Sequence, residues 1–152
     1  MKAVIDKWER KVSSLVDVPL AETGRDWTPP ELKALIEQAI REETPADFSY
    51  MNFGGLRDRL RQGTILVRHV WNMLPFDNRM VIAIVRGSQV PESLRKGQKL
   101  DPVREYKIAM ADFTATNQAE RDRIGLGDIQ FQSTGKLFRD VIIEWMRKKK
   151  VL

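Results

Sequence analysis

Cysteine is absent from this chain of 152 residues, and histidine occurs once, at His69. Without cysteine the chain can form no disulfide, no thiolate metal site and no thiol nucleophile. A two-metal site that hydrolyses phosphate esters needs several histidine, aspartate and asparagine ligands, and one histidine cannot supply them. No nucleophile motif lies near His69 that would complete a serine-histidine-acid triad. We therefore expect no catalytic residue, no metal and no cofactor in this chain.

Long apolar runs are also absent. No stretch approaches the roughly 20 residues of a membrane-spanning helix, so we expect no membrane partner. The N-terminus has three apolar residues between Lys2 and Asp6 and does not resemble a secretory signal. The protein is therefore expected in the cytoplasm if Met1 is its native start. With 42% hydrophobic and 31% charged residues, the chain fits one folded domain that needs no covalent or metal crosslinks.

Positive charge is concentrated in the middle of the chain. Residues 57–99 carry 9 basic and 3 acidic side chains, a net charge of +6, whereas residues 1–50 carry 7 basic and 10 acidic ones. A concentrated positive field attracts anions. This segment therefore points to a phosphate-bearing small molecule or to nucleic acid as partner.

Periodic patterns along the chain predict one α/β (α+β) domain. Thr28-Pro29-Pro30-Glu31 is typical of a helix start, because threonine and glutamate form a capping box and proline suits the first turn. Pro75 should end a short helix over 67–74, and the apolar run 79–87 is typical of a strand buried on both faces. Further helices are predicted over 1–15, 88–97 and from 137 onward, and further strands over 46–53, 104–113 and 129–133; residues 114–127 show no clear pattern. We expect a mixed β-sheet of four to five strands flanked by helices, in a domain over 25–152 that follows a lead-in helix and an extended segment over 1–24.

Two short motifs supply the parts of a small-ligand site. Gly54-Gly55 lets the backbone adopt conformations closed to other residues, and Arg57 follows shortly after. Pro75-Phe76-Asp77-Asn78 is typical of a turn that presents an aromatic face together with an amide. By themselves these residues also fit a plainer interpretation, in which Arg57 is solvated, Phe76 is a core residue and Asn78 only caps the turn.

Both motifs belong to a longer series of residues that resembles a known family. Asn52-x-Gly54-Gly55-x-Arg57 and Pro75-Phe76-x-Asn78, in this order and at this separation, are similar to the C-terminal domain of bacterial 5′-nucleotidases and UDP-sugar hydrolases. The likeness covers residues 25–150 and continues through Leu100-Asp101-Pro102, Tyr106-Lys107-Ile108-Ala109 and Asp112-Phe113. In that family an N-terminal metallophosphatase domain holds two divalent metals, and the C-terminal domain binds the nucleoside.

The resemblance implies roles for individual residues. Phe76 and Phe113 would sandwich the base, Asn78 would read its edge, and Arg57 would meet the phosphates. Asn52, Gly54, Gly55 and Arg25 complete the expected substrate-binding set. Judged by its neighbours alone, Phe113 ends an apolar strand and fits core burial equally well.

The chain also departs from the family pattern in three places. Asn117-Gln118-Ala119 stand where the family has an aspartate that holds the ribose, and Arg25 alone represents two upstream arginines. The short stretch Gly97–Leu100 replaces several strands' worth of sequence.

The expected function is recognition of a nucleotide or nucleoside, with catalysis by a metallophosphatase domain in the same or a neighbouring chain. The divalent metals are expected only in that domain, and a longer chain of this kind would be periplasmic or extracellular. Two alternatives stay open. The first is a degenerate module that keeps only the fold and contacts other proteins. The second is a small basic nucleic-acid-binding protein, which is less expected because no nucleic-acid-binding signature accompanies the basic residues.

Overall fold

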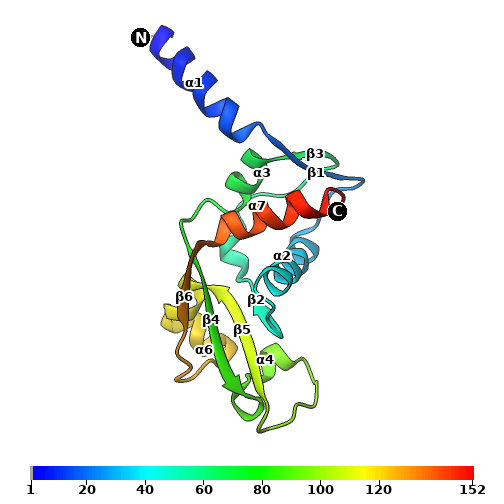
Figure 1. Ribbon diagram of the computed structural model, residues 1–152, viewed down its shortest axis with the longest axis vertical. Helices are drawn as coiled ribbons and strands as arrows, with labels where there is room; N and C mark the ends of the chain where they lie inside the picture. Colours follow the sequence, from blue (N-terminus) through cyan, green and yellow to red (C-terminus); the bar gives the residue numbers. More distant parts are fainter. Residues whose placement is uncertain (1) are drawn as a thin grey trace.

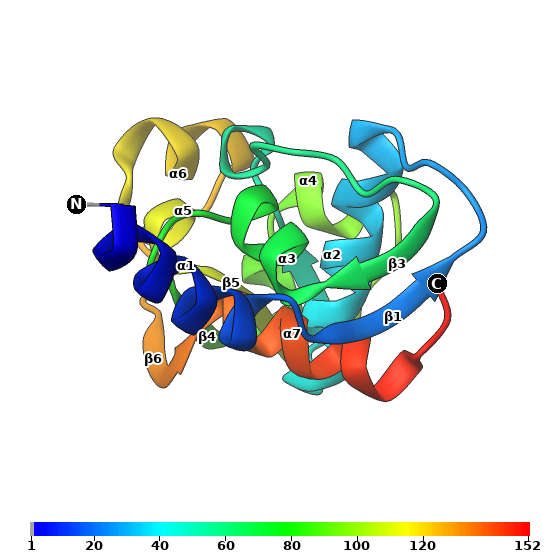
Figure 2. The same cartoon turned by 90° about the horizontal axis from the view of Figure 1, so that it is seen from above.

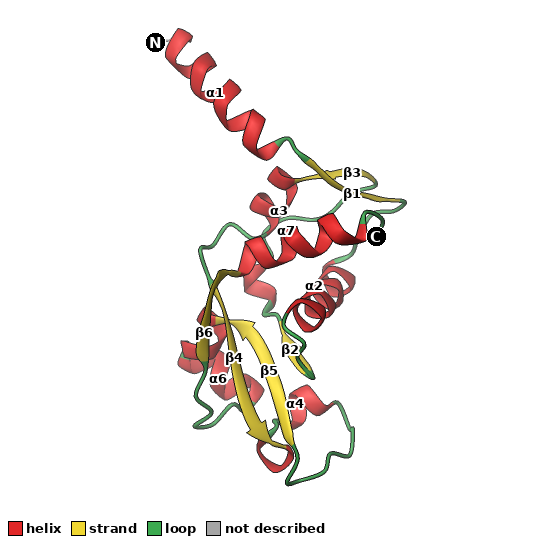
Figure 3. Ribbon diagram, in the orientation of Figure 1, coloured by secondary structure: helices red, strands yellow, loops and turns green. Residues whose placement is uncertain are grey.

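The computed structural model describes residues 2–152, and the side-chain surroundings of residues 2–7 and 10 lie outside that description. Six strands, seven α-helices and two 3₁₀ turns alternate along the described part of the chain (Figures 1 and 3). In chain order they are α1 (Lys2–Val16), β1 (Pro19–Thr23), α2 (Pro29–Glu43), β2 (Phe48–Tyr50), η1 (Phe53–Gly55), β3 (Gly63–Leu66), α3 (Val67–Met73), β4 (Arg79–Arg86), η2 (Gly87–Gln89), α4 (Glu92–Arg95), β5 (Glu105–Ala111), α5 (Asp112–Thr116), α6 (Gln118–Ile124), β6 (Gln132–Leu137) and α7 (Phe138–Lys149).

The main sheet has four strands in the order β2-β5-β4-β6. β2 and β5 run parallel, whereas β4 is antiparallel to both β5 and β6, so the predicted mixed sheet of four to five strands is confirmed. A second, two-stranded antiparallel sheet joins β1 to β3, which lie side by side in Figure 2. β3 was not predicted, because its four residues carry too little pattern and gain their partner from a segment far earlier in the chain.

Local signals set the ends of several helices as predicted. Thr28 and Glu31 form a capping box at the start of α2, where the Glu31 carboxylate accepts from the Thr28 backbone amide at 2.9 Å. α3 ends at Met73, shortly before Pro75. The predicted last strand is displaced, because β6 spans Gln132–Leu137 instead of 129–133.

The two faces of β4 pack against different layers, which corrects one prediction. Val81, Ala83 and Val85 point into a core shared with α4, α5 and α6. Met80 and Ile82 face the other core, which is built mainly from α2, α3 and α7. Ile84 continues that second face but is 61% exposed, because α2 and α7 cover only the end of the sheet nearest to them (Figure 1). β4 is therefore central in the sheet but is not buried on both faces along its whole length.

Helix α1 projects away from the rest of the molecule in Figure 1. Its apolar residues Trp8, Val12 and Leu15 are 58%, 50% and 67% exposed. β1, which follows it, is part of the folded body, since it pairs with β3 and contacts α7. Over residues 2–152, none of the helices combines the length and the apolar character needed to cross a lipid bilayer.

Candidate functional site

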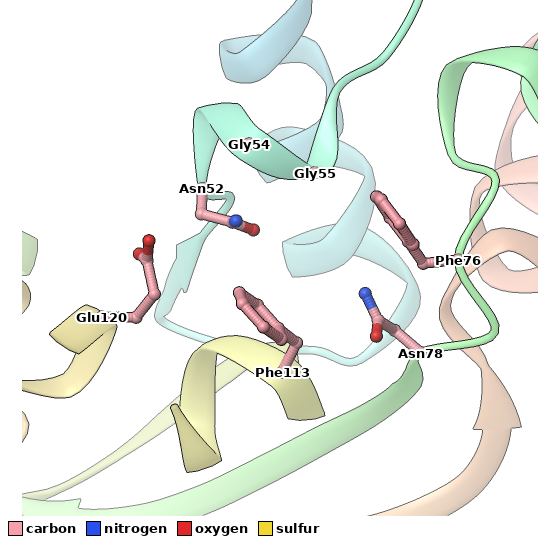
Figure 4. A pocket seen from close by; sticks show the side chains of 7 residues that line it. All are labelled: Asn52, Gly54, Gly55, Phe76, Asn78, Phe113 and Glu120. Carbon is pink, nitrogen blue, oxygen red and sulfur yellow. The ribbon is translucent and has the colours of Figure 1, made fainter. Parts of the chain in front are cut away.

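A cavity of about 250 Å³ lies where three separate segments of the chain meet. One wall comes from η1 and the residue before it, a second from the turn between α3 and β4, and the third from α5 and α6 (Figure 4). We call it the aromatic cavity, and its lining residues are Asn52, Gly54, Gly55, Phe76, Asn78, Phe113 and Glu120. Six of the eight residues in the predicted site are therefore brought together from distant parts of the sequence.

The two phenylalanine rings stand on opposite sides of the aromatic cavity (Figure 4). Phe76 is 47% exposed and Phe113 is 44% exposed. The alternative in which both are core residues is therefore wrong. Phe113 also does not end strand β5 but lies in the first turn of α5, where its backbone amide donates to Asp112 Oδ1 at 2.8 Å.

Asn52 joins two walls of the aromatic cavity. It is only 4% exposed, and its Oδ1 accepts a hydrogen bond from Thr114 Oγ1 at 3.3 Å, which ties the η1 segment to α5. Gly55 leaves the room that Asn52 needs. A Cβ atom at Gly55 would lie 3.0 Å from Asn52 Oδ1 and 2.6 Å from Met51 Cε, whereas a Cβ at Gly54 would meet only Asn52 Nδ2 at 3.5 Å. Lack of room for a side chain therefore explains the glycine at position 55 but not the glycine at position 54.

Glu120 lines the aromatic cavity and was not among the predicted site residues. Its backbone amide donates to Asn117 Oδ1 at 3.1 Å, so Asn117 caps the start of α6. The Asn-x-x-Glu spacing is a local signal for such a helix start, and it could have located this carboxylate. Glu120 pairs with Arg123, and this hydrogen bond raises the pKa of the Arg123 guanidinium.

Arg57 and Arg25 lie outside the aromatic cavity. Arg57 lines a separate hollow of about 300 Å³ together with Arg59 and Arg61, which we call the basic hollow. Arg25 is bonded to Glu31 at 2.5 Å, and its guanidinium lies 4.2 Å from the centre of the Trp27 ring. Hydrogen bonds from Thr28, and then from Arg25, lower the pKa of Glu31 to about 2.

The remaining candidate for chemistry, His69, has a structural contact. Its Nδ1 accepts a hydrogen bond from the Leu66 backbone amide at 3.1 Å, at the start of α3. Among the side chains that the structure describes, no three histidine, aspartate or glutamate residues cluster so that they could hold a metal ion. The described residues therefore do not provide the ligands for a pair of divalent metals, which the resemblance assigns to a separate catalytic domain.

The arrangement suits a flat aromatic ligand. Faces of aromatic rings attract other aromatic rings by dispersion and quadrupole terms, and this attraction tolerates any base. The amide groups of Asn52 and Asn78 both point into the space between the rings (Figure 4), and an amide can donate as well as accept. Two ring faces and an amide edge are the elements needed to hold and read a heterocyclic base.

Comparisons with known proteins identify the family and the fold of the chain. The family described as 5′-nucleotidase, C-terminal domain, matches residues 13–98 of the chain. Protein UshA of Escherichia coli (strain K12) is 23% identical over 193 aligned positions, which take in the whole of this chain and 35% of UshA. A 5′-nucleotidase precursor from Thermus thermophilus has the same fold, with a TM-score of 0.79 at 16% identity over 99% of this chain and 40% of its own. The NAD nucleotidase of Haemophilus influenzae superimposes with a TM-score of 0.76 at 14% identity, over 99% of this chain and 39% of its own.

The family match covers more than half of the chain, so the chain belongs to the 5′-nucleotidase C-terminal domain family. The predicted family and fold class are confirmed. The chain spans only 35–40% of the length of the three proteins just named, so it corresponds to one part of them.

Proposed function

We propose that this chain is the nucleotide- or nucleoside-recognition domain of a 5′-nucleotidase-type hydrolase. The observation that carries the proposal is the aromatic cavity, in which Phe76 and Phe113 stand half-exposed on opposite walls (Figure 4). Two exposed aromatic rings that face a shared space offer a surface to a flat partner, and a nucleobase is such a partner.

Only part of the proposed ligand occupies the aromatic cavity. Its volume of about 250 Å³ is slightly below the ~300–1,000 Å³ of pockets that enclose whole drug-sized ligands. We therefore assign the base to the aromatic cavity, with Asn78 at its edge, and leave the sugar and phosphate outside it. Glu120, which also lines the cavity, has a carboxylate that can accept hydrogen bonds from ribose hydroxyl groups. It would take the role of the aspartate that this chain lacks directly after Phe113.

The phosphate is assigned to the basic hollow. Leu56 and Arg57, which line the basic hollow, directly follow Gly55, which lines the aromatic cavity, so the two linings are consecutive along the chain. Arginine offers a planar fork of donors that fits phosphate oxygens. Hydrolysis is assigned to a metallophosphatase domain in the same or a neighbouring chain, which would hold the divalent metals.

The proposal is tested by titrating the protein with adenosine, AMP and ribose 5-phosphate and monitoring each titration by calorimetry and by nuclear magnetic resonance. We expect adenosine and AMP to shift resonances of Phe76 and Phe113, and ribose 5-phosphate, which has no base, to leave them unchanged. If millimolar AMP shifts no resonance, the proposal is contradicted and the result favours the alternative of a degenerate module that keeps only the fold.

Salt dependence separates the proposal from nucleic-acid binding, which the net charge of +6 over residues 57–99 favours. Binding through many phosphates weakens steeply with salt, with a slope of about −0.9 per neutralised phosphate on a logarithmic scale. A mononucleotide held mainly by stacking should lose little affinity over the same range. A steep slope with an oligonucleotide, together with no binding of AMP, would favour the nucleic-acid alternative.

A further inference from the structure

Arg139 is a buried cation at the N-terminal end of a helix, which is an unfavourable position for a positive charge. It is the second residue of α7, where the helix dipole opposes a positive charge, and it is only 2% exposed. Burying a charged group costs free energy unless the group is paired and hydrogen-bonded. Its placement therefore has to be compensated by contacts outside its own helix.

Those contacts all come from one short stretch of chain, α3 and the turn that follows it. Arg139 Nη1 donates to the backbone oxygen of Leu74 at 3.0 Å and to that of Phe76 at 3.5 Å. Its Nη2 donates to Asp77 Oδ1 at 2.8 Å. The guanidinium also lies 3.7 Å from the centre of the Trp71 ring. One buried cation thus bonds the turn at three places.

A second tether lies beside the first. The backbone amide of Phe138, the first residue of α7, donates to the backbone oxygen of Asn78 at 2.8 Å. The carbonyl groups of Leu74, Phe76 and Asn78 therefore all accept from the first two residues of α7. Proline at position 75 has no amide hydrogen of its own to stabilise the turn. The backbone of the turn is fixed from α7, while the Phe76 ring stays half-exposed over the aromatic cavity.

We infer that Arg139 is a positioning residue of the ligand site, which holds the 74–78 turn so that Phe76 and Asn78 line the aromatic cavity. This inference rests on the proposed function, because the turn matters only as a wall of a site that binds a ligand. The planar guanidinium serves three acceptors in a fixed geometry, which a lysine ammonium on a flexible stem cannot reproduce. Asp77 contributes less than the carbonyl contacts, because its side chain is 80% exposed and its pairing is screened by water.

The first measurement needs no ligand. Order parameters of the backbone amides of residues 76–78 are compared between the wild-type protein, Arg139→Met and Arg79→Met. Arg79 is the matched control, since it is exposed, follows the turn directly and donates to the Gly135 carbonyl at 3.0 Å. We expect order parameters near 0.85, the value typical of rigid backbone, in the wild type and Arg79→Met, and values below about 0.6 in Arg139→Met. A turn that stays ordered in Arg139→Met overturns the inference.

The second measurement is the dissociation constant for AMP. We expect Arg139→Met to weaken binding about tenfold or more, Arg139→Lys to weaken it less, and Arg79→Met to match the wild type. Ile142→Val, a buried change in the same helix, controls for a general loss of stability. Equal weakening in Ile142→Val and Arg139→Met, at equal loss of thermal stability, would make the role of Arg139 merely structural and overturn the inference.

The two measurements separate this inference from the proposed function. If the wild-type protein binds no nucleotide while the turn loses order in Arg139→Met, the proposed function fails and the control of the turn by Arg139 stands. If nucleotide binds and Arg139→Met leaves both the turn and the dissociation constant unchanged, the proposed function stands and the inference fails. Should Arg139→Met not fold, Arg139→Lys carries both measurements, with a smaller change expected in each.

Discussion

Removing the Phe76 ring is the most direct perturbation of the aromatic cavity. In the proposed complex each ring covers one face of the base, so Phe76→Ala removes one of two stacking contacts. Stacking a base on an aromatic side chain contributes about 1–3 kcal/mol. Since each 1.4 kcal/mol is tenfold in affinity, Phe76→Ala should weaken binding of adenosine or AMP by about 5- to 150-fold.

The structure also predicts that this loss is not caused by unfolding. Phe76 is 47% exposed in the turn between α3 and β4, and substitutions at such surface positions usually change stability by about 0.5 kcal/mol or less. Phe53 is a matched control, because it is 49% exposed in the neighbouring η1 segment and does not line the aromatic cavity. Phe53→Ala should therefore bind adenosine as the wild type does.

Isothermal titration calorimetry, with Phe113→Ala and the double variant included, completes the test. We expect Phe113→Ala to lose affinity in the same range, because its ring stands on the opposite side of the aromatic cavity from Phe76 (Figure 4) and would cover the other face of the base in the proposed complex. Wild-type affinity in Phe76→Ala, or an equal loss in Phe53→Ala, would refute the stacking argument.

Four further outcomes are expected. Arg57→Ala should weaken AMP much more than adenosine in calorimetry, because only AMP carries a phosphate; equal losses would remove the basic hollow from the site. Gly55→Ala should lower the free energy of unfolding, measured in urea, by about 1 kcal/mol. This is at the low end of the cost of overpacking, because the Met51 methyl group that the new Cβ would meet can move. Gly54→Ala should lower the free energy of unfolding less, because its Cβ would have more room. Hydrogen bonding, chiefly from Lys149, lowers the pKa of Glu42 to about 2 from 4.5, so Glu42 stabilises the fold above pH 4.5 and that contribution disappears as the pH falls toward 2. The unfolding free energies of wild type and Glu42→Gln should differ by ~0.2–1 kcal/mol at pH 7, because the pair is exposed, and converge near pH 2; a constant difference would contradict this. The isolated chain should not hydrolyse AMP with added divalent metal, and sustained turnover that a chelator abolishes would show a metal site that we do not expect.

Much of the fold was predictable because its signals are local. The capping box of Thr28 and Glu31 fixes the start of α2, and Pro75 limits the helix before it, whatever surrounds them. The apolar run that forms β4 needs a core, so its central place in the sheet followed from its composition alone. The spacing of the glycine and Pro-Phe-x-Asn motifs was enough to indicate the family.

Other features depend on contacts between distant segments, and no local pattern reports these. Residues 114–127 showed no clear pattern because α5 and α6, which supply most of them, are short and polar, and α5 is stabilised by packing on β4 and β5. Ile84 looks buried by composition but is exposed, because α2 and α7 cover only the other end of the sheet (Figure 1). The pairing of β3 with β1 is likewise set by chain segments far apart in sequence.

The same division holds for the candidate site. Its residue types could be predicted without coordinates, since rings, amides and small glycines follow from the two motifs. Which of them share a cavity depends on tertiary contacts: folding gathers six of the predicted residues, adds Glu120 from α6, and places Arg57 and Arg25 elsewhere. Folding also brings Arg139 against a turn that is remote in the sequence. The physical reason is that a buried guanidinium is stable only where its acceptors converge, and that convergence exists only once the chain has folded.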